Sequence, residues 1–347
     1  MFDTVYAEEA AFEYEATGRI LGRLRRFAPE GKITVVPVRS AEDVTARRGQ
    51  RYGLQRDNPK LVLAVNRGPF IHEGSRNCQN FGADAFYYCS VAVNCIGRCS
   101  YCYLSGASRS ANLIAYVNVG DCCGELARLI ADNRGRSLLV PVSYDNDIYA
   151  LEGLFGYVAG FADLAADCGQ RGFGDFALEV RTKCGTRGFL DNINPGAAEN
   201  MIFTWSVSPQ RNIRLFEPAT SPLANRLRAA EYALGKGFRV RLSFDPVLAT
   251  VPTWREDYRG LIEELRRRGI IQALDGAGVG GFRVPADYLK TMRRHDPAAA
   301  PLFDNFVQSG GTLGYSGARE KAITDFVKEC LADAGLDERK IYTTVGG

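Results

Sequence analysis

The sequence predicts an α/β protein whose main part is a partial (β/α)6 barrel of the TIM type. Six short apolar or β-branched runs between residues 85 and 283 alternate with amphipathic stretches at helical spacing. One strand plus one helix averages about 33 residues, which is typical of a β/α unit. Buried strands that are separated by helices pair in parallel, so we expect one parallel sheet.

The six predicted barrel strands are Phe86–Val93, Ser137–Ser143, Phe176–Lys183, Met201–Ser208, Arg239–Asp245 and Ala273–Val279. The helices expected between them are Cys122–Asn133, Gly153–Gln170, Pro222–Lys236 and Trp254–Arg268. The sixth strand is the weakest prediction because it contains two glycines. In α/β barrels the chemistry lies at the carboxyl ends of the strands, so the residues that follow these strands form the candidate site.

We expect a small α/β unit over residues 1–84 and a C-terminal extension over residues 284–347 that covers the barrel. The helix and strands predicted for the N-terminal unit are Ala10–Phe27, Ile33–Val38 and Leu61–Val65. Gly68–Gly82 is rich in Gly, Asn and Pro and is interpreted as a linker. The extension should hold two helices and a last strand, Ile341–Val345.

The composition is that of an ordinary soluble globular protein, with 46% hydrophobic and 24% charged residues in 347. There is no apolar run of about 18 residues, so we expect no membrane span. The acidic N-terminus lacks the layout of a signal peptide, and we expect a cytoplasmic protein. In that reducing compartment, ten cysteines indicate metal binding or catalysis more than disulfides. The formal charge of +3 neither requires nor excludes a nucleic-acid partner.

Three thiols fall within eight residues at the spacing C-x3-C-x2-C; they are Cys95, Cys99 and Cys102. A cubane iron–sulfur cluster normally takes one thiolate on each of its four irons, so these cysteines would leave one iron open. Zinc is the alternative, but it needs four ligands. The chain has only two histidines, and zinc would have to recruit a distant thiol such as Cys89. The third possibility is that the thiols are simply free.

The cysteine spacing resembles that of the radical SAM enzymes, whose core fold is also a partial (β/α)6 barrel. The resemblance implies a [4Fe-4S] cluster whose open iron is chelated by S-adenosylmethionine (SAM). Reduction, by a partner such as flavodoxin or ferredoxin, would then split SAM into methionine and a 5′-deoxyadenosyl radical. Tyr101 matches the family's aromatic residue near the adenine.

Within that superfamily the chain resembles the spore photoproduct lyase family along nearly its whole length. The shared fragments, in order, are VYAEEAAFEY near the start, Cys99–Leu104, Ala115–Asn118, Arg181–Lys183, Trp205–Val207, Phe216–Ser221 and Phe282–Pro285. The resemblance implies that SAM is held by Tyr101, Tyr103, Asn146, Lys183 and Ser206. From the residues alone, Lys183 could equally be an ion-pair partner and Ser206 could face a neighbouring helix.

Two features expected of that family are altered here. Its hydrogen-atom donor is a cysteine just after the second strand, where this chain has Ser143 and Tyr144. A serine O–H bond is too strong to quench a carbon radical, whereas a tyrosine O–H bond is weak enough in principle. The family also grips DNA with a basic C-terminal hairpin. The corresponding segment, Phe303–Tyr315, contains no basic residue, although phosphate binding relies on Lys and Arg.

Cys184 directly follows Lys183 at the end of the third strand, so its thiol could point into the barrel mouth. A thiol can return a hydrogen atom to a carbon radical, as in radical SAM sugar epimerases. The alternative is that Cys184 is a small buried hydrophobic residue. Two further cysteines, Cys78 and Cys89, lie upstream of the motif and are too few to bind a second metal.

The leading hypothesis is a radical SAM enzyme that catalyses a redox-neutral step, such as epimerisation of a carbohydrate or natural-product intermediate. Cys184 or Tyr144 would supply the hydrogen atom, and the partner would be a small-molecule substrate. The first alternative is a DNA-repair lyase similar to spore photoproduct lyase, although nucleic acid is disfavoured by the altered hairpin. The second is a non-catalytic iron–sulfur or zinc protein.

Overall fold

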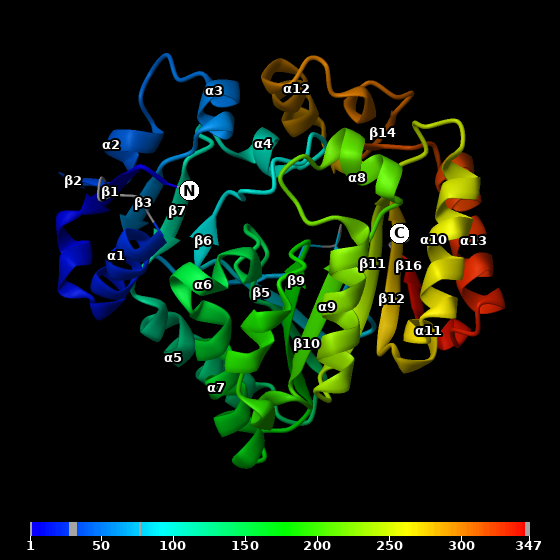
Figure 1. Ribbon diagram of the computed structural model, residues 1–347, viewed down its shortest axis with the longest axis horizontal. Coiled ribbons are helices and arrows are strands. Elements are labelled where there is room, and N and C mark those ends of the chain that lie inside the picture. The colour runs from blue at the N-terminus through cyan, green and yellow to red at the C-terminus, as the bar shows by residue number, and fades with distance from the viewer. Residues whose placement is uncertain (1, 28–32, 76–77, 344–347) are drawn as a thin grey trace.

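The computed structural model describes residues 2–27, 33–75 and 78–343, which form three sheets. Figure 1 shows the two larger sheets with their flanking helices. The first sheet has five strands in the order β2-β1-β3-β7-β6. Their bounds are Thr4–Glu8 (β1), Thr34–Val38 (β2), Leu61–Ala64 (β3), Ala92–Val93 (β6) and Leu113–Tyr116 (β7). Only β6 is antiparallel to its neighbour.

Strand β1 pairs with both β2 and β3 in this sheet and is absent from the sequence prediction. Its side chains alternate, with Val5 and Ala7 fully buried. A pattern of only five residues, followed directly by a helix, is too short to predict a strand. That helix is confirmed in part, as η1 (Glu9–Glu13) and α1 (Glu15–Phe27). Two short helices, α2 (Glu42–Thr45) and α3 (Tyr52–Asp57), precede β3.

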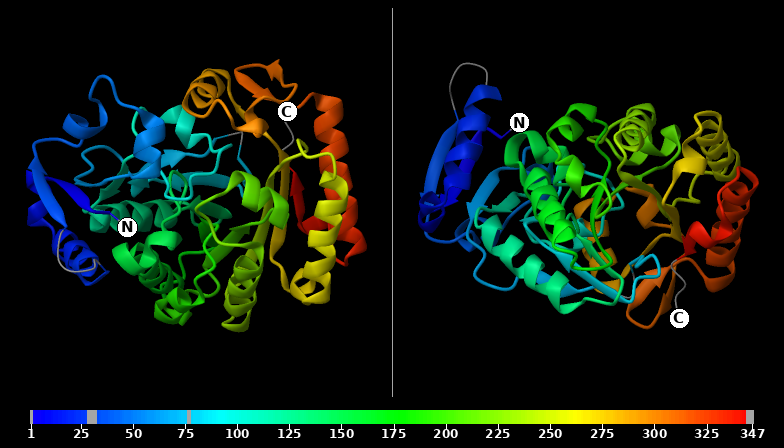
Figure 2. Two further views of the ribbon diagram at one scale, coloured as in Figure 1. Left: turned by 45° about the horizontal axis from the view of Figure 1, so that its top comes forward. Right: turned by 90° about the horizontal axis from the view of Figure 1, so that it is seen from below.

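The second sheet confirms the predicted partial barrel. Its order is β16-β12-β11-β10-β9-β8-β5-β4. The six central strands are parallel and are Ala85–Cys89 (β5), Leu138–Pro141 (β8), Phe176–Thr182 (β9), Met201–Ser206 (β10), Arg239–Val247 (β11) and Gly276–Gly281 (β12). The edge strands are Ile71–Glu73 (β4) and Ile341–Thr343 (β16). The sheet curls but does not close, as the view from below in Figure 2 shows.

Helices cover the outer face of the curled sheet (Figures 1 and 2). They are α5 (Val119–Asp132), α6 (Glu152–Phe155), α7 (Tyr157–Gln170), α8 (Gln210–Phe216), α9 (Leu223–Gly235), α10 (Trp254–Arg267), α11 (Ile270–Ala273) and α13 (Gly317–Asp333). Large side chains such as Phe161, Phe203 and Trp205 are fully buried in this layer. Each contributes about 1.5–3 kcal/mol by leaving water.

The inner side of the curl is partly filled by residues from the predicted linker. Phe81 forms a small cluster with one side chain from each of three adjacent strands, Leu139, Ala177 and Ile202. The segment Gly68–Gly82 is therefore more than a linker, since it also supplies β4. Its Gly, Asn and Pro content indicated a loop correctly, but composition does not show where a loop lies.

Sheet membership also differs from the expected boundaries at residues 84 and 284. Strands β6 and β7 lie beyond residue 84 yet complete the N-terminal sheet. Strand β16, from the C-terminal extension, pairs with β12 in the barrel sheet. Its predicted end, residues 344 and 345, lies outside the described residues. These strands pair with segments that are distant in the chain. The local sequence pattern predicts that a strand forms but does not predict its partner.

The extension holds the two predicted helices, α12 (Ala286–His295) and α13, and between them the expected hairpin. Its strands, Val307–Ser309 (β14) and Thr312–Gly314 (β15), pair with each other, and β15 also pairs with Arg283–Pro285 (β13). Within the part of the chain that the structure describes, no helix is both long and apolar enough to cross a membrane.

Candidate active site

The loop that carries the three cysteines connects β6 to β7 and is closed at its base by Asn94. The backbone of Asn94 is left-handed, with φ of 70°, a conformation that Asn tolerates better than most residues. Its side-chain amide donates to the carbonyls of Ser110, at 2.9 Å, and Asn112, at 2.7 Å. Both ends of the loop are thereby tied to the N-terminal sheet.

The three thiols lie on this loop without a disulfide. The Gly97 amide donates to the Cys95 sulfur at 3.3 Å. Burial raises the pKa of Cys95 and Cys102, and it raises the pKa of Cys99 to about 12 although the Lys183 ammonium opposes the rise. The thiols therefore stay protonated near neutral pH unless a bound metal draws off their protons.

Among the described residues, no three His, Cys, Asp or Glu side chains are grouped closely enough to hold a single metal ion. A cubane cluster is larger than one ion, and its three thiolates occupy separate corners. The donor set of three cysteines on one loop therefore fits an iron–sulfur cluster better than a mononuclear zinc site.

Gly97 is a position where a larger residue should disturb the thiols. A Cβ added there would lie 3.1 Å from Cγ2 of Thr220, 3.4 Å from the Cys95 sulfur and 3.8 Å from the Cys99 sulfur. We expect Gly97→Ala to lower the iron bound per chain after anaerobic reconstitution, and Gly97→Ala/Thr220→Ser to recover part of it. Gly120→Ala, at a position with open space, is the control. Equal iron content in all variants would contradict this expectation.

Lys183 and Tyr101 meet on the inner side of the cysteine loop, as the resemblance implied. The Lys183 ammonium lies 2.6 Å from the Tyr101 hydroxyl, 3.6 Å from the Cys99 sulfur and 3.3 Å from the Glu217 carboxylate. The Tyr101 hydroxyl donates to Glu217, which also accepts from Arg226. Lys183 is thus both an ion-pair partner and a neighbour of the cysteines, so the two earlier interpretations are compatible.

Glu217 is the carboxylate that balances this buried group of charges. It is 1% exposed and Arg226 is fully buried. Burial alone would raise the pKa of Glu217, but the Lys183 ammonium and the Arg226 guanidinium lower it to about 2. Burial would likewise lower the pKa of Lys183, but the Cys99 sulfur, once ionised, and the Glu217 carboxylate raise it. Both groups are therefore ionised at neutral pH.

The other residues assigned to SAM lie around the same loop. The Tyr103 hydroxyl donates to the Tyr144 carbonyl at 3.0 Å. The Asn146 side chain is buried and donates to the Asn94 carbonyl, while its Oδ1 atom has no partner among the described residues. That oxygen is a buried acceptor whose hydrogen-bonding capacity is not met by any described residue. Ser206 ends β10, and its carbonyl accepts from Arg226 at 2.8 Å.

Cys184 follows β9, which ends at Thr182. Its backbone amide donates to the Thr182 hydroxyl at 2.9 Å. Cys184 belongs to the main hydrophobic core, its sulfur contacts the Thr186 hydroxyl at 3.4 Å, and its carbonyl accepts from Trp205. This position favours the interpretation of Cys184 as a small buried residue.

Cys78 is the thiol that the structure brings to the inner side instead. Its sulfur lies 3.1 Å from the Tyr144 hydroxyl, and the Tyr144 ring stacks on Tyr88 with centroids 4.0 Å apart. It also lies close to two inward-facing guanidiniums. Burial lowers the pKa of Arg181 and Arg283, but Glu179 and Asp245, respectively, raise it, and Cys78 adds to the rise in both.

Sequence reasoning missed Glu217, Arg226 and Cys78 as members of the site. The fragment Phe216–Ser221 was already part of the family resemblance, so its only acidic residue was a signal for Glu217. Arg226 carried no signal, because arginine on an amphipathic helix is usually exposed. Cys78 lay in the apparent linker, where only its residue type marked it.

A family model described as spore photoproduct lyase matches residues 1–275, which is more than half of the chain. The chain belongs to the spore photoproduct lyase family. The family's enzymes are radical SAM enzymes, so the predicted cofactors, a [4Fe-4S] cluster and SAM, are confirmed.

Two curated spore photoproduct lyases match most of the chain. The enzyme of Bacillus subtilis (strain 168) is 25% identical over 265 residues, which cover 75% of this chain and 72% of that protein. The enzyme of Geobacillus sp. (strain Y412MC61) is 26% identical over 271 residues, which cover 74% and 72%.

Solved structures of spore photoproduct lyase share the fold. A double mutant with bound AdoMet and dinucleoside spore photoproduct matches with a TM-score of 0.80 at 20% identity, covering 99% of this chain and 98% of that chain. A complex with dinucleoside spore photoproduct matches with a TM-score of 0.78 at 18% identity and the same coverage. The likeness extends over the C-terminal extension, which the family model does not reach.

These findings correct the leading functional hypothesis. The predicted family and partial barrel are confirmed, but nothing in the comparisons supports a carbohydrate epimerase. The lyase alternative fits better, because both curated relatives are lyases. A carbohydrate substrate is equally unsupported, since the solved relatives hold a dinucleoside lesion. The replaced donor cysteine and the hairpin without basic residues were therefore not sufficient reason to prefer an epimerase over a lyase.

Proposed function

We propose that the protein is a radical SAM lyase that splits the covalently joined thymines of spore photoproduct. The proposal rests on membership of the family and on one observation within the barrel. That observation is the contact of 3.1 Å between the Cys78 thiol and the Tyr144 hydroxyl. It supports Cys78 as the hydrogen-atom donor, because Tyr144 stands where the family's own donor cysteine is replaced.

In this proposal Cys95, Cys99 and Cys102 hold the cluster, and SAM lies on its inner side between two groups of residues. Lys183 and Tyr101 form one group, and Tyr103 and Asn146 form the other, with Ser206 beyond Arg226. Bound there, the cofactors supply the 5′-deoxyadenosyl radical that removes a hydrogen atom from the substrate. The Lys183 ammonium, beside the Cys99 sulfur, is available to the SAM carboxylate.

Cys78 and Tyr144 are then the hydrogen-donating pair. The S–H bond is weak, so the thiol can give its hydrogen atom to the carbon radical left when the thymines separate. One hydrogen atom leaves the substrate and one returns, so the thiol must be restored in each turnover. The Tyr144 hydroxyl, in contact with the sulfur, would restore the thiol by giving its hydrogen atom to the thiyl radical. The phenoxyl radical left on Tyr144 would then take a hydrogen atom from 5′-deoxyadenosine, which carries the one removed from the substrate. Tyr144 is thereby kept as a catalytic residue, and Cys78 takes the role first assigned to Cys184.

The inner surface around Cys78 suits a polar, hydrogen-bonding substrate such as a thymine pair. Arg283 makes a two-point ion pair with Asp245, at 2.9 and 2.8 Å, and Arg181 pairs with Glu179 at 2.8 Å. Charges fixed in this way keep the site open to polar groups without leaving unpaired cations.

The function is tested with the dinucleoside lesion itself. Anaerobically reconstituted protein, SAM and dithionite are incubated with dinucleoside spore photoproduct, and thymidine and 5′-deoxyadenosine are measured by chromatography. We expect release of thymidine that depends on both SAM and reductant. If SAM is cleaved while the lesion stays intact, the lyase proposal is wrong and the radical SAM assignment stands. If neither occurs with an intact cluster, both are wrong.

A further inference from the structure

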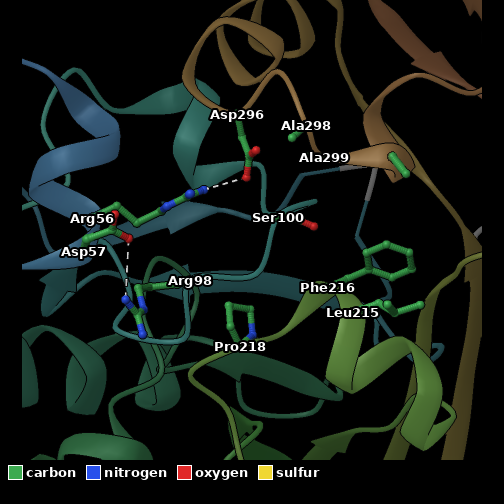
Figure 3. Close-up of a pocket in the computed structure, with 11 residues that line it drawn as sticks. Arg56, Asp57, Arg98, Ser100, Leu215, Phe216, Pro218, Asp296, Ala298 and Ala299 are labelled. Atoms are coloured by element: carbon green, nitrogen blue, oxygen red, sulfur yellow. Dashed lines mark hydrogen bonds and ion pairs between the residues drawn. The ribbon is translucent and has the colours of Figure 1, made fainter.

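The cysteine loop has an outer side as well as the inner side that faces the barrel. On that outer side lies a cavity of about 480 Å³, shown in Figure 3. Arg98 and Ser100, the two neighbours of Cys99, are part of its lining. The floor of the cavity is therefore the cluster loop itself, and nothing in the lining belongs to the proposed SAM or lesion site.

The rim of this cavity is largely apolar. It includes Leu215, which is 59% exposed, with Phe216, Pro218 and the stretch Ala298–Ala300. The charged residues of the rim are paired with one another. Arg56 pairs with Asp296 at 2.8 Å and Arg98 with Asp57 at 3.5 Å, as the dashed lines in Figure 3 mark.

A second cavity, of about 660 Å³, adjoins the first across α3 and α12. Helix α3 contributes Tyr52 and Gly53 to the second cavity and Arg56 and Asp57 to the first. The end of α12 lines the second cavity with Arg294 and His295, whereas the residues that follow it, Asp296 and Ala298–Ala300, line the first. On its third side stand α4 (Leu104–Ala107) and Ser108, which directly follow the cysteine loop.

The second cavity is basic and contains no acidic residue in its lining. Arg51, Arg109 and Arg294 line it and are exposed. None of the three forms an ion pair with a described residue. The ion pairs of this region are made by Arg56 and Arg98. His295 adds no charge at neutral pH, because burial lowers its pKa while its ring stacks on Tyr52.

We propose that these two cavities form the docking surface for a small acidic electron-transfer protein, of the flavodoxin or ferredoxin class. The carrier's apolar cofactor edge would face the apolar rim over Arg98 and Ser100, and its carboxylates would face the three arginines. Charge complementarity of this kind speeds encounter and fixes orientation, and redox complexes have small interfaces. One electron passes from the flavin hydroquinone, which becomes a semiquinone, to the cluster, and no bond forms or breaks.

The position explains how reduction and catalysis can share one cluster. The inner side of the loop is taken up by Lys183, Tyr101 and Glu217 and by the proposed SAM and lesion sites. Only the outer side is left for a protein partner that must come close to the cysteines. The inference rests on the cluster at these cysteines and is independent of which substrate is cleaved.

The test compares Arg51→Glu/Arg109→Glu with a matched control, Arg25→Glu/Arg26→Glu. The control makes the same change in charge at exposed arginines on α1. The affinity of a purified flavodoxin for the cluster-loaded proteins is measured by anaerobic calorimetry at low and high salt. We expect at least about tenfold weaker binding for the first variant, with loss of most of the salt dependence, and unchanged binding for the control.

Cleavage of SAM is measured in parallel with reduced flavodoxin and with dithionite. The first variant should be slowed about tenfold with flavodoxin and unchanged with dithionite, which needs no docking surface. Leu215→Asp, on the apolar rim, should behave in the same way. Equal flavodoxin affinity in all variants, or an equal loss with both reductants, overturns the proposal. So does loss of binding to a labelled DNA duplex while flavodoxin binding is kept, because the arginines would then be a nucleic-acid surface.

Discussion

Replacing Cys78 by alanine is expected to reduce thymidine formation from the lesion on the order of 10²-fold, equivalent to about 2.7 kcal/mol of transition-state free energy. The reason is that the Cys78 sulfur is the thiol in contact with Tyr144 on the inner side of the sheet. SAM cleavage should continue, because the first hydrogen abstraction does not use Cys78. Product formation and 5′-deoxyadenosine, measured in the same reaction, separate the two steps.

Two further variants make the role of Cys78 specific. Cys78→Ser keeps a hydroxyl beside Tyr144 but has an O–H bond too strong to donate, so it should be as impaired as Cys78→Ala. Cys184→Ala should remain within about twofold of the wild type, because Cys184 is packed in the hydrophobic core. In deuterated water the wild type should place deuterium in the product, and Cys78→Ala should not. Impairment of Cys184→Ala with normal Cys78→Ala would reverse the assignment.

The Glu217→Gln substitution is expected to lower the free energy of unfolding by about 3–5 kcal/mol. It would leave the Lys183 ammonium and the Arg226 guanidinium without a compensating charge inside the protein. Urea denaturation of the cluster-free protein at neutral pH measures the loss. Glu263→Gln, which removes an exposed carboxylate paired with Arg266, is the control and should have no measurable effect.

The same variant carries a pH signature. The pKa of Glu217 is lowered from its ordinary value near 4.5 to about 2 in the folded protein. Its stabilising contribution is therefore complete above about pH 4.5 and is lost as the pH falls toward 2. The difference in stability between wild type and Glu217→Gln should shrink across that interval. A difference that stayed constant down to pH 3 would show that packing, and not charge, is responsible.

The barrel could be predicted from the sequence because its strands are continuous apolar runs with helices between them. All six appear in the sheet, in order and in parallel. The positions of the cysteine loop and Tyr101 could also be predicted, because they belong to the cysteine motif. Lys183 could be predicted because it stands at the end of a predicted strand. Predictions failed where distant segments meet. The pairing of β7 with β3 and the entry of Phe81 into the barrel depend on contacts that no local pattern encodes.

The choice between Cys184 and Cys78 shows the same limit at the scale of one residue. Cys184 was favoured because it stands next to Lys183 in the chain, but the structure packs it in the hydrophobic core. Cys78 lies 66 residues from Tyr144 in sequence and touches it in space. The epimerase hypothesis lacks support for a related reason, because the residue types at two positions were taken as the whole of the site.

The cysteine loop is anchored between β6 and β7, which belong to the N-terminal sheet. The other strands of that sheet, β1, β2 and β3, come earlier in the chain than the loop, and five of the six parallel barrel strands come later. During synthesis, the frame that holds the cysteines can therefore be complete while most of the barrel has yet to leave the ribosome. Iron could then be inserted into a formed loop on a growing chain, and the barrel would close over a cluster already in place.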